Sequence, residues 1–158
     1  MNEAEIRKIV QDTISARKAD RSKMTLSLAE RLCDEVISKA KAMGVRAVVC
    51  ISDAGGHPIL VKCMDDAYIA SYDVAVNKAF TVVALKMSTL TLKPLAQPGG
   101  SLYGIQFTNG GKIVIFGGGD TLTDGDGRIV GGIGVSGGSE DEDSELSAYG
   151  KTYFEAKM

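Results

Sequence analysis

Hydrophobic positions repeat with a helical period in the first part of the chain. Residues 2–14 place four aliphatic side chains on one face of a predicted helix, with charged side chains elsewhere: Ile6, Ile9, Val10 and Ile14. Residues 15–23 lose this period and carry basic side chains, which predicts a solvated linker. A second helix is expected over residues 25–44, with a capping box formed by Ser27 and Glu30 and a glycine at its end.

Downstream of residue 44, apolar runs typical of strands alternate with one long helical segment. Strands are expected at 45–52 and 58–64 around the turn "DAGGH", then a helix at 68–88, a loop at 91–104, strands at 103–107, 112–119 and 127–137, and a final helix from Ser139. This order predicts an α+β fold, in which helices pack on an antiparallel sheet.

Residues 132–137 spell G-x-G-x-x-G, the fingerprint of a dinucleotide-binding loop. That loop requires a strand before the glycines, a helix after them and then a second parallel strand. A strand and a helix are expected here, but the 158-residue chain ends within the helix. A dinucleotide site is therefore not expected.

Composition narrows the class of protein. The length fits one domain, the net charge is −2 and the sequence pI is about 5.4, which favours neither nucleic acid nor a membrane surface as partner. The N-terminus lacks a secretory apolar region, so a cytoplasmic protein is expected. Cys33, Cys50 and Cys63 have no metal-binding spacing and are expected to be reduced thiols, with no metal site.

Two basic side chains are candidates for chemistry. His57 is the only histidine and follows a Gly-Gly turn, where a structural role is favoured over a catalytic one. Lys78 lies in an apolar helical segment; it is either a reactive lysine with a lowered pKa or, as favoured, a lysine at the helix rim. A carboxylate beside Lys78, such as Asp53 or Asp120, would support an enzyme acting on a carbonyl or imine compound.

Two acidic segments have simple structural interpretations. Asp120, Asp124 and Asp126 resemble a calcium loop, but the spacing of an EF-hand is missing and Asp-Gly turn chemistry explains the residues. The run at 139–145 fits the start of a helix, with Ser139 and Glu142 as a capping box.

Several motifs in order resemble one known family: "DAGGH", "CMDDA", "ASYDVAVNKAFTV", "GGG" and "IVGGIGVSGG" followed by "EDEDSELSAYG". They are similar to the GlcG/HbpS family, which includes the C-terminal domain of PduO, and cover about residues 25–150. The resemblance implies a profilin-like antiparallel sheet flanked by helices in a domain over 19–158, and assembly into dimers or larger homo-oligomers. It also implies that the glycines at 131–138 allow close backbone approach and bind no phosphate.

The resemblance further implies a non-enzymatic accessory protein that binds a small molecule or tetrapyrrole, haem or a corrinoid. His57 and Cys33 are the implied cofactor-binding residues, and Lys78 and Asp120 are expected to line a ligand pocket. Residues 25–44 lack histidine, and Cys63 replaces an arginine that usually precedes "MDGA" in the family. A small enzyme with a subunit-interface pocket and a purely structural oligomer remain alternatives.

Residues 1–18 precede the resemblance to that family. They are similar to the encapsulation peptides of bacterial microcompartment enzymes, which implies a shell or cargo protein as partner and a location inside a diol-, glycerol- or ethanolamine-type microcompartment. The aliphatic stripe is too short to fold stably alone and would order on a partner. Packing on the protein's own domain or on a sister subunit is the alternative.

Overall fold

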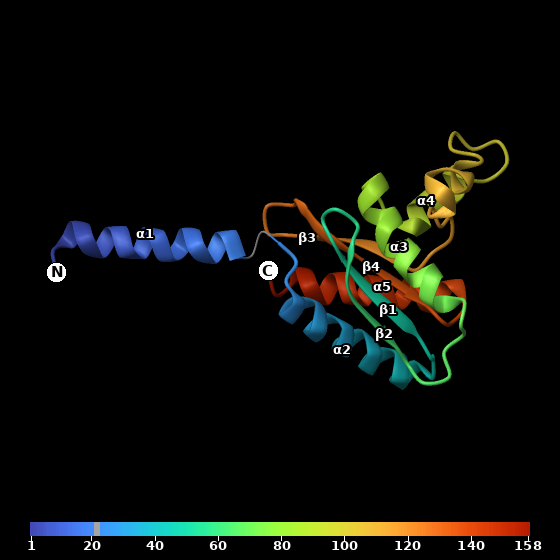
Figure 1. The fold of residues 1–158 in the computed structure, drawn as a ribbon, viewed down its shortest axis with the longest axis horizontal. Coiled ribbons are helices and arrows are strands. Elements are labelled where there is room, and N and C mark those ends of the chain that lie inside the picture. The colour runs from blue at the N-terminus through green and yellow to red at the C-terminus, as the bar shows by residue number, and fades with distance from the viewer. Residues whose placement is uncertain (21–22) are drawn as a thin grey trace.

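A computed structural model describes residues 1–20 and 23–158, with side chains at 1–16 and 23–158 (Figure 1). The elements are α1 (Glu3–Asp20), α2 (Leu26–Met43), β1 (Val48–Asp53), β2 (Pro58–Cys63), α3 (Ser71–Leu85), α4 (Thr89–Leu95), the 3-10 turns η1 (Ile105–Phe107) and η2 (Asn109–Gly111), β3 (Gly119–Thr123), β4 (Ile129–Ser136) and α5 (Glu140–Glu155).

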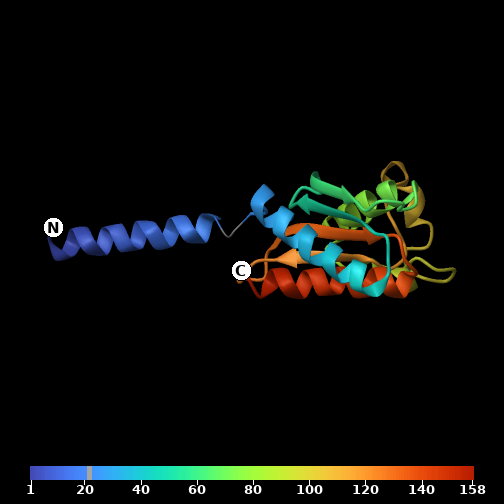
Figure 2. The same cartoon turned by 90° about the horizontal axis from the view of Figure 1, so that it is seen from below.

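The described strands form one antiparallel sheet in the order β2-β1-β4-β3, so that β2 and β3 are its edges. Helices α2 and α5 cover one face, and α3 covers the other (Figures 1 and 2). The larger core lies under α2 and α5, where Leu32, Val36 and Leu146 meet Ile51 and Ile133 of the sheet. The predicted α+β fold is confirmed.

Helix α3 lies unusually close to β4. A Cβ atom at Gly134 would be 2.0 Å from the carbonyl oxygen of Ala75, and one at Gly132 would be 2.6 Å from that of Ala79. Side chains alternate across a strand, so the glycines face α3 while Ile133 and Val135 face the core under α2 and α5. Gly132 and Gly134, the first two glycines of G-x-G-x-x-G, therefore serve helix–sheet packing.

A buried ion pair joins α3 to α5. Lys78 is fully buried; its Nζ lies 3.0 Å from Asp143 Oδ2, donates to the Val135 carbonyl oxygen at 2.7 Å and sits 4.9 Å from the centre of the Phe116 ring. Burial lowers the pKa of Lys78 and raises the pKa of Asp143, while their mutual attraction opposes both shifts. The expectation of a rim lysine is wrong, because the ammonium lies inside the layered structure.

The strands expected at 103–107 and 112–119 are not formed; 105–107 and 109–111 are 3-10 turns, and β3 begins only at Gly119. The backbone has positive φ at Gly104, Gly110 and Gly111, which a strand cannot accommodate. A side chain also holds the loop, because Thr81 Oγ1 accepts a hydrogen bond from the backbone N–H of Val114 at 3.0 Å.

Several predicted boundaries also change. Helix α1 continues to Asp20 through much of the expected linker, of which 21–22 lie outside the described residues. Thr25, and not Ser27, caps α2, because its side chain accepts from the N–H of Leu28. Helix α4 occupies part of the expected loop, with its N-terminus capped by Ser88.

Three local predictions are confirmed. Gly44 ends α2 in the left-handed region, with φ of 74°. Ser139 and Glu142 form the capping box of α5. The turn at Asp53 joins β1 to β2, and its carboxylate accepts from the N–H groups of Gly55 and His57.

We expect Gly134→Ala to destabilise the fold by about 1–3 kcal/mol, because the new methyl group would displace the α3 backbone. The matched control is Gly125→Ala, where the added Cβ meets no atom within 4 Å; it should change the free energy of unfolding by less than about 0.5 kcal/mol. Urea unfolding of both variants measures the difference, and equal midpoints would contradict the close approach.

We expect Lys78→Met alone to cost about 3–5 kcal/mol, because it leaves the Asp143 carboxylate buried without its cation. The double variant Lys78→Met with Asp143→Leu should recover most of this loss, because neither a buried ammonium nor a buried carboxylate then remains. Urea unfolding of the two variants tests the pair. A double variant that is no more stable than Lys78→Met would contradict the inference.

Candidate functional site

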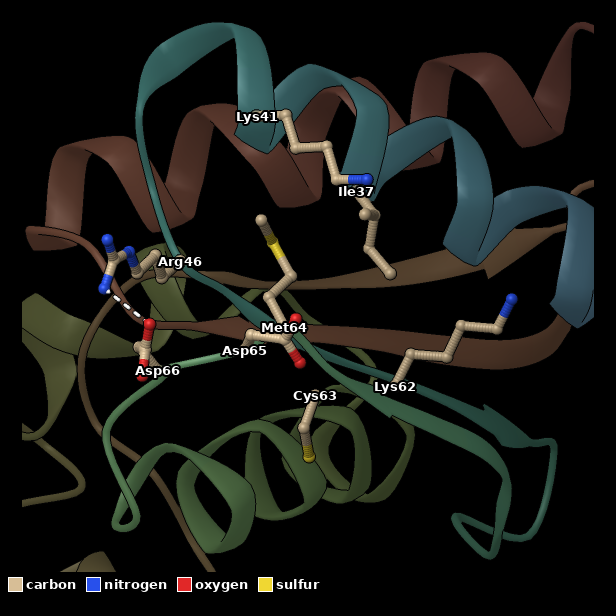
Figure 3. A pocket seen from close by; sticks show the side chains of 8 residues that line it. All are labelled: Ile37, Lys41, Arg46, Lys62, Cys63, Met64, Asp65 and Asp66. Atoms are coloured by element: carbon tan, nitrogen blue, oxygen red, sulfur yellow. Dashed lines mark hydrogen bonds and ion pairs between the residues drawn. The ribbon is translucent and has the colours of Figure 1, made fainter.

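An open pocket lies between α2 and the outer edge strand β2 (Figure 3). We call it the α2–β2 pocket; its volume is about 580 Å³, within the range usual for small-molecule sites. Its lining comes from α2, from the loop before β1, and from the end of β2 with the turn that follows: Ile37, Lys41, Arg46, Lys62, Cys63, Met64, Asp65 and Asp66.

Apolar side chains and a thioether form the inner wall of the α2–β2 pocket. In Figure 3, Met64 points toward Ile37 of α2, while the Cys63 sulfur points to the opposite side of the strand, toward α3. The Met64 Sδ accepts the N–H of Ala47 at 3.2 Å, which fixes the sulfur at the base of the pocket. Cys63 is an exposed free thiol.

Cations surround this wall. Arg46 pairs with Asp66 at 3.1 Å, and Lys62 pairs with Asp34 at 2.5 Å. The hydrogen bond with Asp34 raises the pKa of Lys62. Lys41 has no ion-pair partner among the residues that the structure describes. The pocket therefore combines an apolar wall and sulfur with ammonium and guanidinium groups suited to carboxylates.

A second hollow, which we call the α3–α5 pocket, has a volume of about 270 Å³ and lies where the N-termini of α3 and α5 approach the end of β4. Tyr68, Val74 and Phe116 supply apolar lining, and Ser71 and Ser136 supply hydroxyl groups. Its remaining lining residues are Ala70, Gly137, Gly138, Glu140 and Asp143.

The structure does not bring the two expected cofactor ligands together. Cys33 is fully buried on α2, and burial raises the pKa of its thiol to about 12, so it is not available as a thiolate. The His57 side chain is 82% exposed in the β1–β2 turn, with Nδ1 3.4 Å from Asp53 Oδ1. Neither residue lines the α2–β2 pocket.

Lys78 and Asp120, expected to share a pocket, have different partners. The carboxylate beside Lys78 is Asp143, and neither Asp53 nor Asp120. Asp120 accepts from Ser147 Oγ at 2.7 Å, and burial raises the pKa of its carboxyl group. Met64 and Asp143 were not predicted from the sequence. Two adjacent sulfur-containing residues at the end of a strand, and an acidic residue in the first turn of a helix, were the signals that could have indicated them.

The acidic turn has the structural role that was favoured. Asp124 Oδ1 accepts from the N–H groups of Asp126 and Arg128, both at 2.9 Å, which closes the β3–β4 turn. Among the described residues, no cluster of three or more His, Cys, Asp or Glu side chains is arranged to hold a metal ion. None of the described helices combines the length and apolar character needed to cross a membrane.

Comparison with known proteins places these features in a family. The model of the family described as "Haem degrading protein HbpS-like" matches residues 24–151. A 15.0 kDa protein from the dhaT-dhaS intergenic region of Citrobacter freundii is 40% identical over 78% of this chain and 87% of its own length. The corrinoid adenosyltransferase PduO of Salmonella typhimurium is 36% identical over 90% of this chain, which spans only 44% of PduO.

Solved structures agree with this relationship. The Klebsiella pneumoniae protein ORFY has a TM-score of 0.80 and 37% identity, covering 83% of this chain and 90% of its own. A PduOC–haem complex has a TM-score of 0.78 and 35% identity, covering 82% of this chain and 94% of its own. The resemblance to the GlcG/HbpS family and the PduO C-terminal domain that the motifs indicated is confirmed. The chain therefore belongs to the HbpS-like family.

Proposed function

We propose that the chain is an accessory protein that binds haem or a related tetrapyrrole. The observation that carries this proposal is the likeness to a PduOC–haem complex, at 35% identity over 82% of the chain. The HbpS structures, at 25–26% identity and TM-scores of 0.73–0.75, support the same function class. The activity of full-length PduO is not part of the proposal, because the chain spans less than half of that protein.

The α2–β2 pocket has the chemistry that a haem requires. Ile37 and Met64 offer apolar contact to a macrocycle, and Lys41, which has no ion-pair partner among the described residues, is a cation for a propionate group. The thioether of Met64 belongs to a class of side chain that ligates haem iron. A bound haem would supply iron for redox chemistry or for binding a small ligand, while the pocket residues would hold and orient it.

His57 is an alternative iron ligand at a separate place. It precedes β2, whereas Cys63 ends that strand, so about 20 Å of extended chain separates the two positions. One haem cannot use both His57 and the α2–β2 pocket of the same subunit. The fully enclosed Cys33 would require opening of the core, which leaves His57 as the accessible member of the expected ligand pair.

Two further expectations bear on the functional context. Self-association stays a prediction; Tyr68 and Ile69, which are 73% and 97% exposed, support it by presenting apolar surface beside the start of α3.

A microcompartment location is also proposed. In support, the stripe on α1 is uncovered, with Ile6, Ile9, Val10 and Ile14 each 45–53% exposed.

Haemin titration tests the tetrapyrrole proposal. We expect a saturable Soret shift at a fixed stoichiometry, a changed Soret position in Met64→Leu and a Kd about three- to tenfold higher in Lys41→Gln. Met43→Leu, on α2 but outside the pocket, is the matched control and should bind as the wild type does. Loss of the shift in His57→Ala alone would place haem at the β1–β2 turn, and no saturable shift in the wild type would contradict haem binding.

A fusion of residues 1–18 to a fluorescent protein tests the role of α1. In a bacterium that makes microcompartments, we expect fluorescent foci that coincide with the shells, because the aliphatic stripe would fold against a shell or cargo protein. The variant with Ile9→Asp and Ile14→Asp should be diffuse. Replacing Lys8 and Asp12 by alanine is the matched control and should keep the foci. A wild-type fusion that stays diffuse while shells assemble would contradict the proposal.

A further inference from the structure

The α3–α5 pocket lies apart from the α2–β2 pocket and is not used by the proposed tetrapyrrole function. It opens beside the turn that joins β4 to α5, on the α3 side of the sheet. Tyr68 comes from the segment before α3, Val74 from its first turns, and Phe116 from the loop before β3. Together with the residues at 136–143, the stretch 68–74 and Phe116 form one small hollow from three parts of the sequence.

Two buried serine hydroxyl groups provide a hydrogen-bonding site in the α3–α5 pocket. Ser136 Oγ donates to Ser71 Oγ at 3.1 Å, and the two residues are only 8% and 5% exposed. The pair contains two hydroxyl protons, of which one lies in the shared bond. The other has no acceptor among the residues that the structure describes. A buried donor without an acceptor is unfavourable, and an acceptor atom on a ligand would satisfy it.

The charged groups at the pocket are already paired. Asp143 accepts from Lys78 and from the N–H of Gly138, and Glu140 accepts from Lys93 at 2.6 Å and from the N–H of Gly117. Lys78 in turn is enclosed between Asp143, the Val135 carbonyl oxygen and the Phe116 ring. Among the described residues that line the pocket, no cation is left for an anionic ligand, and Lys78 is not placed to attack a carbonyl group. A neutral ligand fits this arrangement.

The volume of the α3–α5 pocket limits the size of a ligand. An apolar cavity of about 150 Å³ holds benzene, and the α3–α5 pocket is about 270 Å³. A compact molecule with a ring or short chain would contact Tyr68, Val74 and Phe116 while its oxygen reaches the serine pair.

We propose that the α3–α5 pocket binds a small, neutral, mostly apolar carbonyl compound, whose oxygen accepts the free hydroxyl proton of the Ser71–Ser136 pair. The ligand is bound without covalent chemistry. This makes the pocket a second small-molecule site, and it places the ligand against the residues that surround the Lys78–Asp143 ion pair.

Titration of the ¹⁵N-labelled full chain with cyclohexanone, followed by amide chemical shifts, tests this proposal. We expect saturable shifts centred on Gly137, Gly138 and Phe116. Ser71→Ala should raise the Kd about three- to tenfold, which is the loss expected for one hydrogen bond. Ser101→Ala, at an exposed position outside the pocket, should leave the Kd unchanged.

A second variant separates loss of binding from loss of folding. Val74→Phe should fill the pocket and abolish the shifts, whereas Val74→Ala should retain them; the dispersion of the remaining amide signals reports whether each variant is folded. Linear shifts scattered over the surface, or a Kd unchanged in both Ser71→Ala and Val74→Phe, would overturn the proposal.

Discussion

The close approach of α3 to β4 determines much of this structure. Because Gly132 and Gly134 have no side chains, the helix backbone at Ala75 and Ala79 rests almost directly on the strand. Because the helix lies so close to the strand, the Lys78 ammonium reaches the carbonyl oxygen of Val135 and the carboxylate of Asp143 at the start of α5. The glycines thus bring the ammonium of one helix to the carboxylate of another.

Local sequence patterns predicted the features that local chemistry determines. The turn at 53–57, the capping box at Ser139 and the end of α2 at Gly44 each depend on residues within a few positions. The segment 103–119 could not be predicted in this way, because positive φ at its glycines and a hydrogen bond from Val114 to Thr81 decide its path. Apolar side chains alone favoured strands there.

The candidate site was predictable in chemistry but not in position. The motifs indicated tetrapyrrole-binding relatives, and the family comparison agrees. The choice of Cys33 rested on residue type, whereas its availability depends on burial that only the packing of α2 on the sheet reveals. Similarly, the Met64 side chain points toward α2 and the Cys63 sulfur points toward α3, because neighbouring side chains of an extended chain alternate.

The position of β2 at the edge of the sheet affects how copies of this chain can meet. An edge strand offers backbone groups to which a strand from another molecule could add, which is a common route to aggregation. Here Pro58 removes one donor at the start of β2, and the register of the β1–β2 pairing shifts between Ile51 and Ser52, which interrupts the regular ladder. Continuous strand addition along this edge is thereby disfavoured.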